Sequence, residues 1–186
     1  CGVMELGTFA LSGTLVLLPS FEPGHVLELL ERFEGTMILA VPTMLMRLLE
    51  HPDHSMRDLS GLRTVMTGGA PVPVALVGRV KAAFDCRFTI TYGQTETSGP
   101  ATQTSPGDAD PDQAETLGRP LPWVEVKIVD PLDGGTLPFD TQGEICFRGP
   151  LLMDSYFDRP EATATTIDAD GWLHTGDLGT LDERGF

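Results

Sequence analysis

Residues 62–97, LRTVMTGGAPVPVALVGRVKAAFDCRFTITYGQTET, decide the fold of this chain. They begin with a predicted strand, LRTVMT, at 62–67, which the glycines and prolines of 68–73 end. Apolar residues then recur at helical spacing over 74–84, before an apolar run, RFTIT, at 87–91. A strand, a helix and another strand with short connections predict a right-handed crossover between parallel strands.

The same alternation is present upstream. The runs TLVLL at 14–18 and TMILAV at 36–41 are each compatible with a fully buried strand. Between them, apolar residues from Val26 to Phe33 form one stripe of a helix that Pro23 can open. Another helix is expected from Pro42. We therefore predict an α/β fold with a mainly parallel sheet flanked by helices.

The sequence changes in character after residue 100, where a loop rich in proline, glycine and aspartate begins. The segments VEVKIV (124–129) and GEICF (143–147) are typical of half-buried strands, and RPEATATTI of a short helix. GWLHTGDLGTLDERGF favours two short strands hinged at Gly176-Asp177. We expect one subdomain at 1–120 and a second, small β-barrel-like or antiparallel β subdomain at 121–186.

The composition is that of a soluble globular protein, because 41% of the 186 residues are hydrophobic and 21% are charged. The formal net charge of -15 repels phosphate backbones and anionic membranes, so no nucleic acid is expected as a partner. The apolar stretch 3–18 is interrupted and shorter than a bilayer span, and no basic segment precedes it. We expect no integral membrane segment and no signal peptide.

The cysteines Cys1, Cys86 and Cys146 lack the C-x-x-C spacing of zinc sites and lie near apolar segments. We expect free, buried thiols and a reducing, cytoplasmic location. The 4 histidines show no metal-ligand spacing, and the sequence contains no G-x-S-x-G nucleophile motif.

Three polar or glycine-containing segments follow predicted strands: Pro42-Thr43, GGAP at 68–71 and YGQTET at 92–97. Ligands bind beyond the carboxyl ends of parallel strands, because backbone amides and helix N-termini meet there. In GGAP, Gly68 and Gly69 carry no Cβ and tolerate positive φ, so a flat group could lie against the backbone. An ordinary turn would use the same residues.

YGQTET combines an aromatic ring that can stack on a base, hydroxyls for phosphate oxygens and a carboxylate for Mg²⁺. The alternative is a polar loop in which Thr95, Thr97 and Ser98 cap the following turn. In GWLHTGDLG, Asp177 on a tight turn could accept both hydroxyls of a ribose. An Asx turn is the alternative interpretation there.

The segments TVMTGGAPVP, ITYGQTETSG, GEICFRG and GWLHTGDLG, in this order, resemble the adenylate-forming superfamily of acyl-CoA synthetases, peptide-synthetase adenylation domains and firefly luciferase. The similarity extends to the spacers TLGRPLP and YFDRPEATA and is closest to the fatty-acyl-CoA synthetases. Peptide-synthetase adenylation domains usually carry a proline where this chain has Gln94. The resemblance implies an AMP-forming acid–thiol ligase that acts in lipid metabolism.

The resemblance implies a two-step reaction. A carboxylic acid attacks the α-phosphate of ATP to give an acyl adenylate and pyrophosphate, and the thiol of coenzyme A then displaces AMP. Glu96 would hold Mg²⁺, and Thr95 would contact the α-phosphate. The other implied contacts are Tyr92 on adenine, Gly69, Ala70 and Pro71 around the base, Gly93 and Gln94 beside the nucleotide, Asp177 on the ribose, and Thr43, Met44 and Gly93 in the acyl pocket.

Two parts of the family pattern are missing from this sequence. A Ser/Thr/Gly-rich phosphate loop usually lies upstream of the matched region, and a C-terminal lid domain with a catalytic lysine lies downstream. The resemblance therefore implies a fragment of the large N-terminal domain, which would need the missing N- and C-terminal portions of its parent chain. We expect the fragment alone to be inactive.

Two other functions remain open from the sequence. The parent could be an adenylating ligase for an aromatic or amino acid that loads a carrier protein in place of coenzyme A. The chain could also be a non-catalytic nucleotide-binding module in which YGQTET serves as a sensor.

Overall fold

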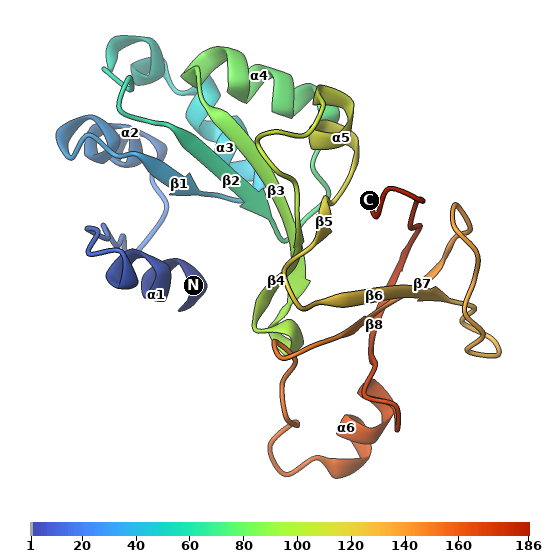
Figure 1. Cartoon of the computed structure of the whole chain (residues 1–186). Coiled ribbons are helices and arrows are strands. Elements are labelled where there is room, and N and C mark those ends of the chain that lie inside the picture. Colours follow the sequence, from blue (N-terminus) through green and yellow to red (C-terminus); the bar gives the residue numbers. More distant parts are fainter. Residues whose placement is uncertain (1) are drawn as a thin grey trace. The chain divides into compact units, whose positions relative to one another are not determined.

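The computed structural model describes residues 2–186 (Figure 1). Residue contacts divide the chain into two compact units, Cys1–Thr89 and Ile90–Phe186. The boundary falls inside strand β3, whereas the sequence change near Leu121 coincides with the start of a second sheet. Over the described residues, no helix has both the length and the hydropathy that crossing a bilayer requires.

Among its described residues, the first unit contains four α-helices, one 3₁₀ helix and three strands, of which the last continues into the second unit. The helices are α1 (Gly2–Ala10), α2 (Pro23–Arg32), α3 (Pro42–Glu50), η1 (Pro52–Met56) and α4 (Val74–Phe84). The strands are β1 (Met37–Leu39), β2 (Thr64–Gly68) and β3 (Arg87–Gln94). β1 and β2 pair in parallel, as the crossover predicts.

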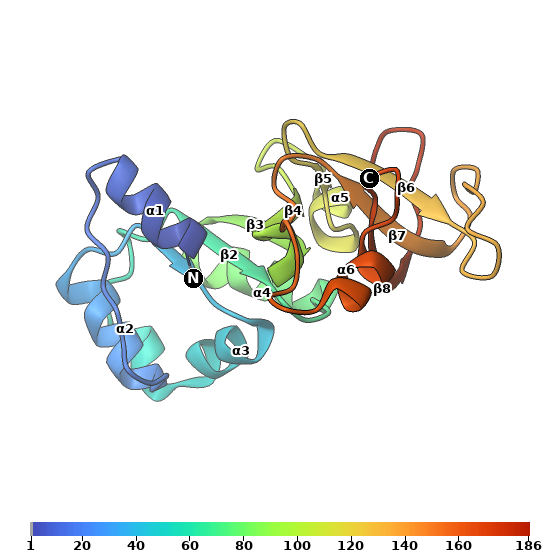
Figure 2. The ribbon, with the colours of Figure 1, turned by 90° about the horizontal axis from the view of Figure 1, so that it is seen from below.

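The helical stripes predicted from the sequence supply much of the core of this unit. Val26 of α2, Leu45 of α3 and Val80 of α4 are buried as predicted. The α2 stripe is only partly right, because Phe33 is 50% exposed and Leu27, outside the stripe, is buried. Figure 2 shows α2 and α3 side by side, which is the packing that two amphipathic helices need in order to bury these stripes. Both helices begin at the predicted proline.

Two predictions for this unit are wrong. Residues 14–18 form no strand, and Leu17 within them is 72% exposed. A run of β-forming residues becomes a strand only where a neighbour supplies hydrogen bonds, and this run pairs with none of the described strands. The segment 36–41 does contain β1, but Met37 and Leu39 are exposed, so the strand is not fully buried.

The second unit begins within β3 and contains the last strands of the first sheet and the whole of a second sheet. Its further strands are β4 (Gly99–Gln103), β5 (Arg119–Pro120), β6 (Glu125–Val129), β7 (Gly143–Arg148) and β8 (Leu173–Gly179). Its helices are η2 (Thr95–Thr97), α5 (Asp110–Glu115) and α6 (Pro160–Thr166). Antiparallel β4 and β5 follow β3, so the five-stranded sheet, in the order β1-β2-β3-β4-β5, is mixed.

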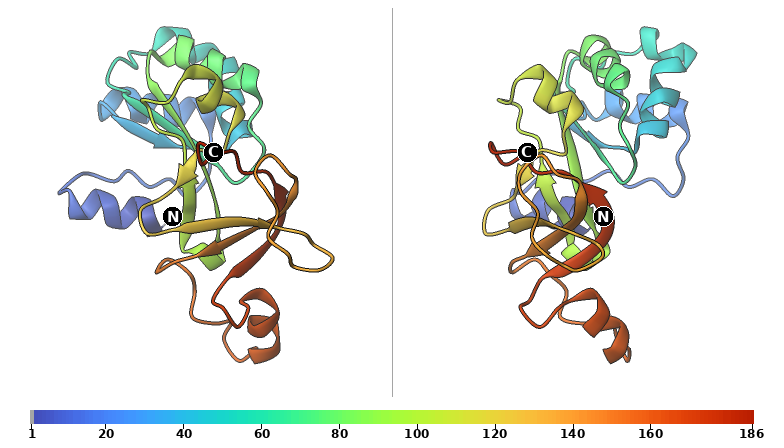
Figure 3. Two further views of the ribbon diagram at one scale, coloured as in Figure 1. Left: turned by 45° about the vertical axis from the view of Figure 1, so that its right-hand side comes forward. Right: turned by 90° about the vertical axis from the view of Figure 1, so that its right-hand side faces the viewer.

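The second sheet has the order β6-β7-β8 and is antiparallel throughout. Val124, Ile128, Ile145 and Phe147 are buried together, whereas Glu125 is exposed, as the alternating sequence predicts. In both views of Figure 3, α6 lies next to β8. The predicted α/β fold followed by a small antiparallel sheet is therefore confirmed.

Two local expectations fail in this unit. β8 runs from Leu173 to Gly179 as one strand, so the predicted pair of strands hinged at Gly176-Asp177 is wrong. β3 continues to Gln94, so Tyr92 and Gly93 lie in a strand and not in a loop. The pairing of β3 with β4 satisfies backbone groups that a polar sequence would otherwise leave to water.

Candidate functional site

Strands β3 and β8 bring together the side chains of Tyr92, Gln94 and Asp177, which we call the Asp177 cluster. The Tyr92 hydroxyl donates to Asp177 Oδ2 over 2.6 Å, although the two residues are 85 positions apart. Gln94 Nε2 donates to the same oxygen over 3.2 Å and to the Thr175 carbonyl over 2.8 Å. Asp177 is exposed, so its carboxylate stays accessible to a ligand.

Tyr92 is half-buried and packs against Phe147, with ring centroids 6.0 Å apart. Burial raises the pKa of its phenol far above the usual range, and the hydrogen bond to Asp177 raises it further. The phenol is therefore protonated at neutral pH and acts as a donor. Its proton holds the Asp177 carboxylate beside the ring.

Glu96 lies in η2 and is half-buried. The Tyr156 hydroxyl donates to Glu96 Oε1 over 2.6 Å, and the Met153 amide donates to the Glu96 carbonyl over 2.8 Å. The carboxylate raises the pKa of Tyr156, so this phenol also stays protonated. A carboxylate is the donor type that Mg²⁺ prefers, and a single one suffices when phosphate oxygens bind too, so Glu96 fits this ion.

The threonines of this loop have different surroundings. Thr95 is exposed, as a phosphate contact requires. Thr97 is buried, and its hydroxyl accepts from the Gln94 amide over 2.8 Å and lies 2.6 Å from the Gly99 carbonyl. The alternative in which threonines of this loop cap the following turn thus applies to Thr97. Thr95 and Glu96 remain candidates for contacts with a ligand.

Gly93 has a packing role that the sequence did not indicate. A Cβ at this position would overlap the carbonyl oxygen of Gly99 on β4. The close approach of β3 and β4 explains this glycine without an acyl ligand. Its prediction as a pocket residue is not tested by this contact.

The remaining predicted residues belong to the first unit. Gly69 follows β2 with φ of 76° and has no atom within 4 Å of an added Cβ, as expected for a backbone open to a flat group. Ala70 and Pro71 are exposed beside it. Thr43 is exposed and Met44 half-buried on the first turn of α3. Their roles stay predictions.

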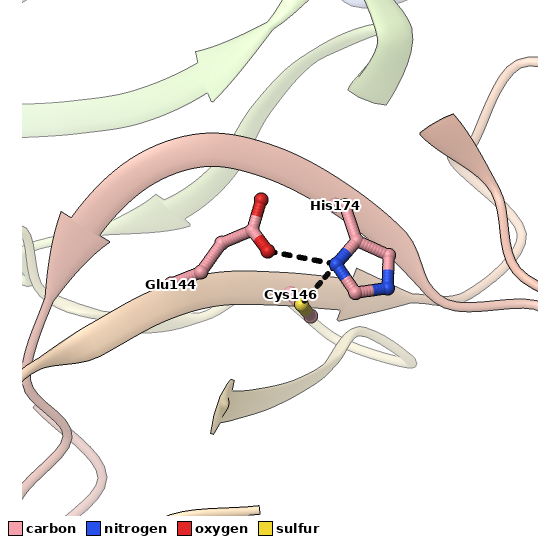
Figure 4. Close-up of side chains that lie close together, drawn as sticks. All are labelled: Glu144, Cys146 and His174. Carbon is pink, nitrogen blue, oxygen red and sulfur yellow. Dashed lines mark hydrogen bonds and ion pairs between the residues drawn. The ribbon is translucent and has the colours of Figure 1, made fainter. Parts of the chain in front are cut away.

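Glu144, Cys146 and His174 form a group that the sequence analysis missed (Figure 4). His174 Nδ1 lies 2.8 Å from Glu144 Oε2 and 3.5 Å from Cys146 Sγ. Alternation along β7 places Glu144 and Cys146 on one face, which the sequence allowed. The pairing of Cys146 with His174 depends on the register of β7 and β8, which the sequence did not specify.

This group has the nitrogen, sulfur and oxygen atoms of a metal site, but its contacts are those of a hydrogen-bond network. Both Glu144 oxygens are already engaged, one by His174 and the other by the Gly176 amide. Burial and the neighbouring Glu144 carboxylate raise the pKa of Cys146 to about 12, so the thiol keeps its proton. Cys146 is a free, buried thiol as predicted, whereas Cys86 is free but only half-buried. Cys1 lies outside the described residues.

Comparison with known proteins explains the ordered motifs. The model of the AMP-binding enzyme family matches residues 1–157. The chain belongs to this family. It is 39% identical over 175 residues to medium/long-chain-fatty-acid–CoA ligase FadD8 of Mycobacterium tuberculosis. This alignment covers 94% of this chain and 30% of FadD8. The chain is 39% identical over 173 residues to 4-coumarate–CoA ligase 2 of Oryza sativa subsp. japonica, covering 91% and 30%.

Solved structures share this architecture. ATP-bound MatB from Rhodopseudomonas palustris superposes with a TM-score of 0.88 at 31% identity, covering 98% of this chain and 35% of MatB. The chain therefore spans about a third of the length of these relatives. The resemblance to acyl-CoA ligases and the interpretation of the chain as part of an N-terminal domain are confirmed.

Proposed function

We propose that this chain forms the nucleotide-binding part of an ATP-dependent acyl-CoA synthetase. The observation that carries the proposal is the Asp177 cluster, in which an aromatic ring and an exposed carboxylate from distant segments meet. Such a pair offers one surface to a base and acceptors to a ribose. The names of the CoA-ligase relatives and of ATP-bound MatB support the same substrates.

In this proposal Asp177 binds the ribose hydroxyls and Tyr92 stacks on adenine. The phenol and the Gln94 amide approach the carboxylate through Oδ2, so the hydroxyls of a ribose would add to an acceptor that is already oriented. The family resemblance also assigns Gly69, Ala70 and Pro71 to contacts with the base. A carboxylate held in advance loses little freedom when the nucleotide binds.

Thr95 and Glu96 serve the chemical step. A carboxylate that attacks the α-phosphate brings two anions together, so the site must offset charge that accumulates on phosphate oxygens. Mg²⁺ held by Glu96 would supply this compensation when bound. The exposed Thr95 hydroxyl donates a hydrogen bond to the α-phosphate, while Tyr156 orients the Glu96 carboxylate.

We propose a fatty acid as the acid substrate, and the family resemblance assigns Thr43, Met44 and Gly93 to contacts with its acyl group. Its carboxylate displaces pyrophosphate from ATP, and the thiol of coenzyme A then displaces AMP from the acyl adenylate. The rice relative is named for coumarate, which keeps an aromatic acid as the second candidate.

The test is pyrophosphate release by the parent protein that contains this chain, supplied with ATP, Mg²⁺ and either an alkanoate, a coumarate-like acid or an amino acid. We expect turnover with the alkanoate and acyl-CoA as the product. Turnover with amino acids alone would favour carrier-protein loading, and nucleotide binding without pyrophosphate release would favour a non-catalytic module.

Asp177→Asn should raise the KM for ATP about tenfold, because the amide halves the acceptors offered to a ribose. Asp133→Asn is the matched control, because Asp133 only accepts from the Gly135 amide in an exposed turn, which an amide oxygen can still do. Equal KM values for both variants would contradict the role of Asp177.

A further inference from the structure

The segment of β8 that carries Asp177 departs from regular pairing. Cys146 lies opposite His174, whereas Glu144 lies opposite Leu178. Residues 175–177 therefore face Ile145 alone, which makes this part of β8 a bulge. Bulges leave backbone donors without ladder partners and redirect side chains, and here the redirected side chain is Asp177.

Side chains replace the missing ladder bonds in this bulge. Glu144 Oε1 accepts from the Gly176 amide over 2.9 Å, at a position where φ is 74°. The Thr175 hydroxyl donates to the Ile145 carbonyl over 2.7 Å and lies 3.1 Å from the Asp177 amide. Glu144 is the charged group among these anchors, and hydrogen bonds to a charged group are the stronger ones.

Glu144 also fixes the residue at the start of the bulge. Its Oε2 lies 2.8 Å from His174 Nδ1, and His174 Nε2 lies 3.6 Å from Asp168 Oδ2 (Figure 4 shows the first contact). One carboxylate thus holds both residues that flank Thr175. It is 18% exposed, so water competes weakly for it.

We propose that Glu144 is a positioning residue that sets the place of the Asp177 carboxylate beside Tyr92. Its hydrogen bonds with His174 and Gly176 fix the backbone of the bulge, and this backbone orients the Asp177 side chain. The consequence for nucleotide affinity rests on the proposed function. The consequence for Tyr92 does not, because it concerns a contact within this chain.

The first test observes Tyr92 in the 186-residue chain. The sequence has 2 tyrosines, so Tyr156→Phe with 3-fluorotyrosine labelling leaves Tyr92 as the single fluorine reporter in ¹⁹F NMR. Glu144→Ala should lower the apparent pKa of Tyr92 and move its resonance toward the values of Asp177→Asn. Burial is the larger cause of the raised pKa, and the Asp177 carboxylate, which raises it further, would no longer be held in contact.

Glu125→Ala is the matched control. Glu125 lies in the same sheet but pairs with Arg148 on the surface, away from the bulge. It should leave the Tyr92 resonance and titration unchanged. A general loss of sheet stability would affect both variants, whereas a positioning role affects only Glu144→Ala.

Glu144→Gln keeps the proposal testable if the alanine variant does not fold. The amide oxygen can still accept from Gly176, while the bond from His174 to a carboxylate is lost, so a smaller shift in the same direction is expected. Folded Glu144 variants with the parent resonance and titration would overturn the proposal.

The second test measures ATP turnover in the parent protein. Glu144→Ala should raise the KM for ATP about tenfold while kcat changes by less than about threefold, because ribose binding and not the reacting phosphate is disturbed. A loss in kcat with an unchanged KM would overturn the positioning role. If the unaltered protein does not turn over ATP, the proposed function fails, and the ¹⁹F result still decides the role of Glu144.

Discussion

At the residue scale, two side chains change their acid–base behaviour because of where the fold places them. Cys146 is buried completely, and burial together with Glu144 raises the pKa of its thiol to about 12. Tyr156 keeps its proton beside Glu96. Neither raised pKa could be predicted from the sequence, because the groups that surround each side chain come from distant parts of the chain.

Cys146 should make the stability of the chain depend on pH in alkaline solution. The thiol pKa rises from 9.0 to about 12 on folding, so above pH 9 the unfolded chain loses a proton that the folded chain keeps. The free energy of unfolding then falls by up to about 1.4 kcal/mol per pH unit until the folded thiol also ionises. Below pH 9 this contribution is constant.

Urea unfolding at pH 7.5 and pH 10 measures the effect. Cys146→Ala should lose less stability between these two pH values than the unaltered chain. Cys86→Ala is the comparison, because the pKa of Cys86 is also raised but this thiol is only half-buried. If the unaltered chain and Cys146→Ala lose the same stability between these pH values, Cys146 is not the source of the pH dependence.

Tyr156→Phe removes only the hydroxyl that orients Glu96. In the parent protein we expect the Mg²⁺ concentration for half-maximal pyrophosphate release to rise about fivefold, since one hydrogen bond to a charged group is lost. Phe157→Leu is the control, because that ring is 97% exposed. If the unaltered parent, Tyr156→Phe and Phe157→Leu show the same Mg²⁺ dependence, Tyr156 has no role in Mg²⁺ binding.

At the element scale, strand pairing decides what single residues do. β3 continues past its apolar part because β4 pairs with it, and the residue at the tightest point of this pairing is Gly93. β8 continues through Gly176 because β7 supplies partners on both sides of the bulge. Apolar periodicity shows where a strand can be buried, but a partner strand decides where it ends.

Gly93→Ala should destabilise the chain by about 2 kcal/mol, because its Cβ would overlap backbone atoms that cannot move without separating β3 from β4. Gly107→Ala is the control, since its Cβ would meet only a side-chain oxygen 3.9 Å away. The midpoints of urea unfolding of the two variants check this. Equal midpoints would mean that β4 yields to the added methyl group.

At the scale of the whole molecule, the chain spans about a third of the length of its relatives. Its second unit contains the Asp177 cluster, Glu96 and Tyr156, which together could hold a nucleotide. Under the proposed function, the phosphate-loop and lysine-lid regions of the family would supply further donors against the charge that accumulates at the α-phosphate.

The 186-residue chain should therefore release no measurable pyrophosphate with a fatty acid, ATP and Mg²⁺, whereas the proposed function predicts that the parent protein does. Both proteins are assayed at equal concentration, and a folded state of the short chain is verified by circular dichroism. Turnover by the short chain at the rate of the parent would show that the phosphate-loop and lysine-lid regions of the family are dispensable.

The sequence by itself determined the class of the fold, the positions of α2, α3, α4 and α6, and the family. These follow from local periodicity, prolines at helix starts and ordered motifs, which are written in consecutive residues. Tertiary structure alone decided that 14–18 is not a strand, that Tyr92 bonds Asp177 and that Glu144 anchors a bulge. The physical reason is that hydrogen-bond partners and burial depend on strand register, which distant segments fix together.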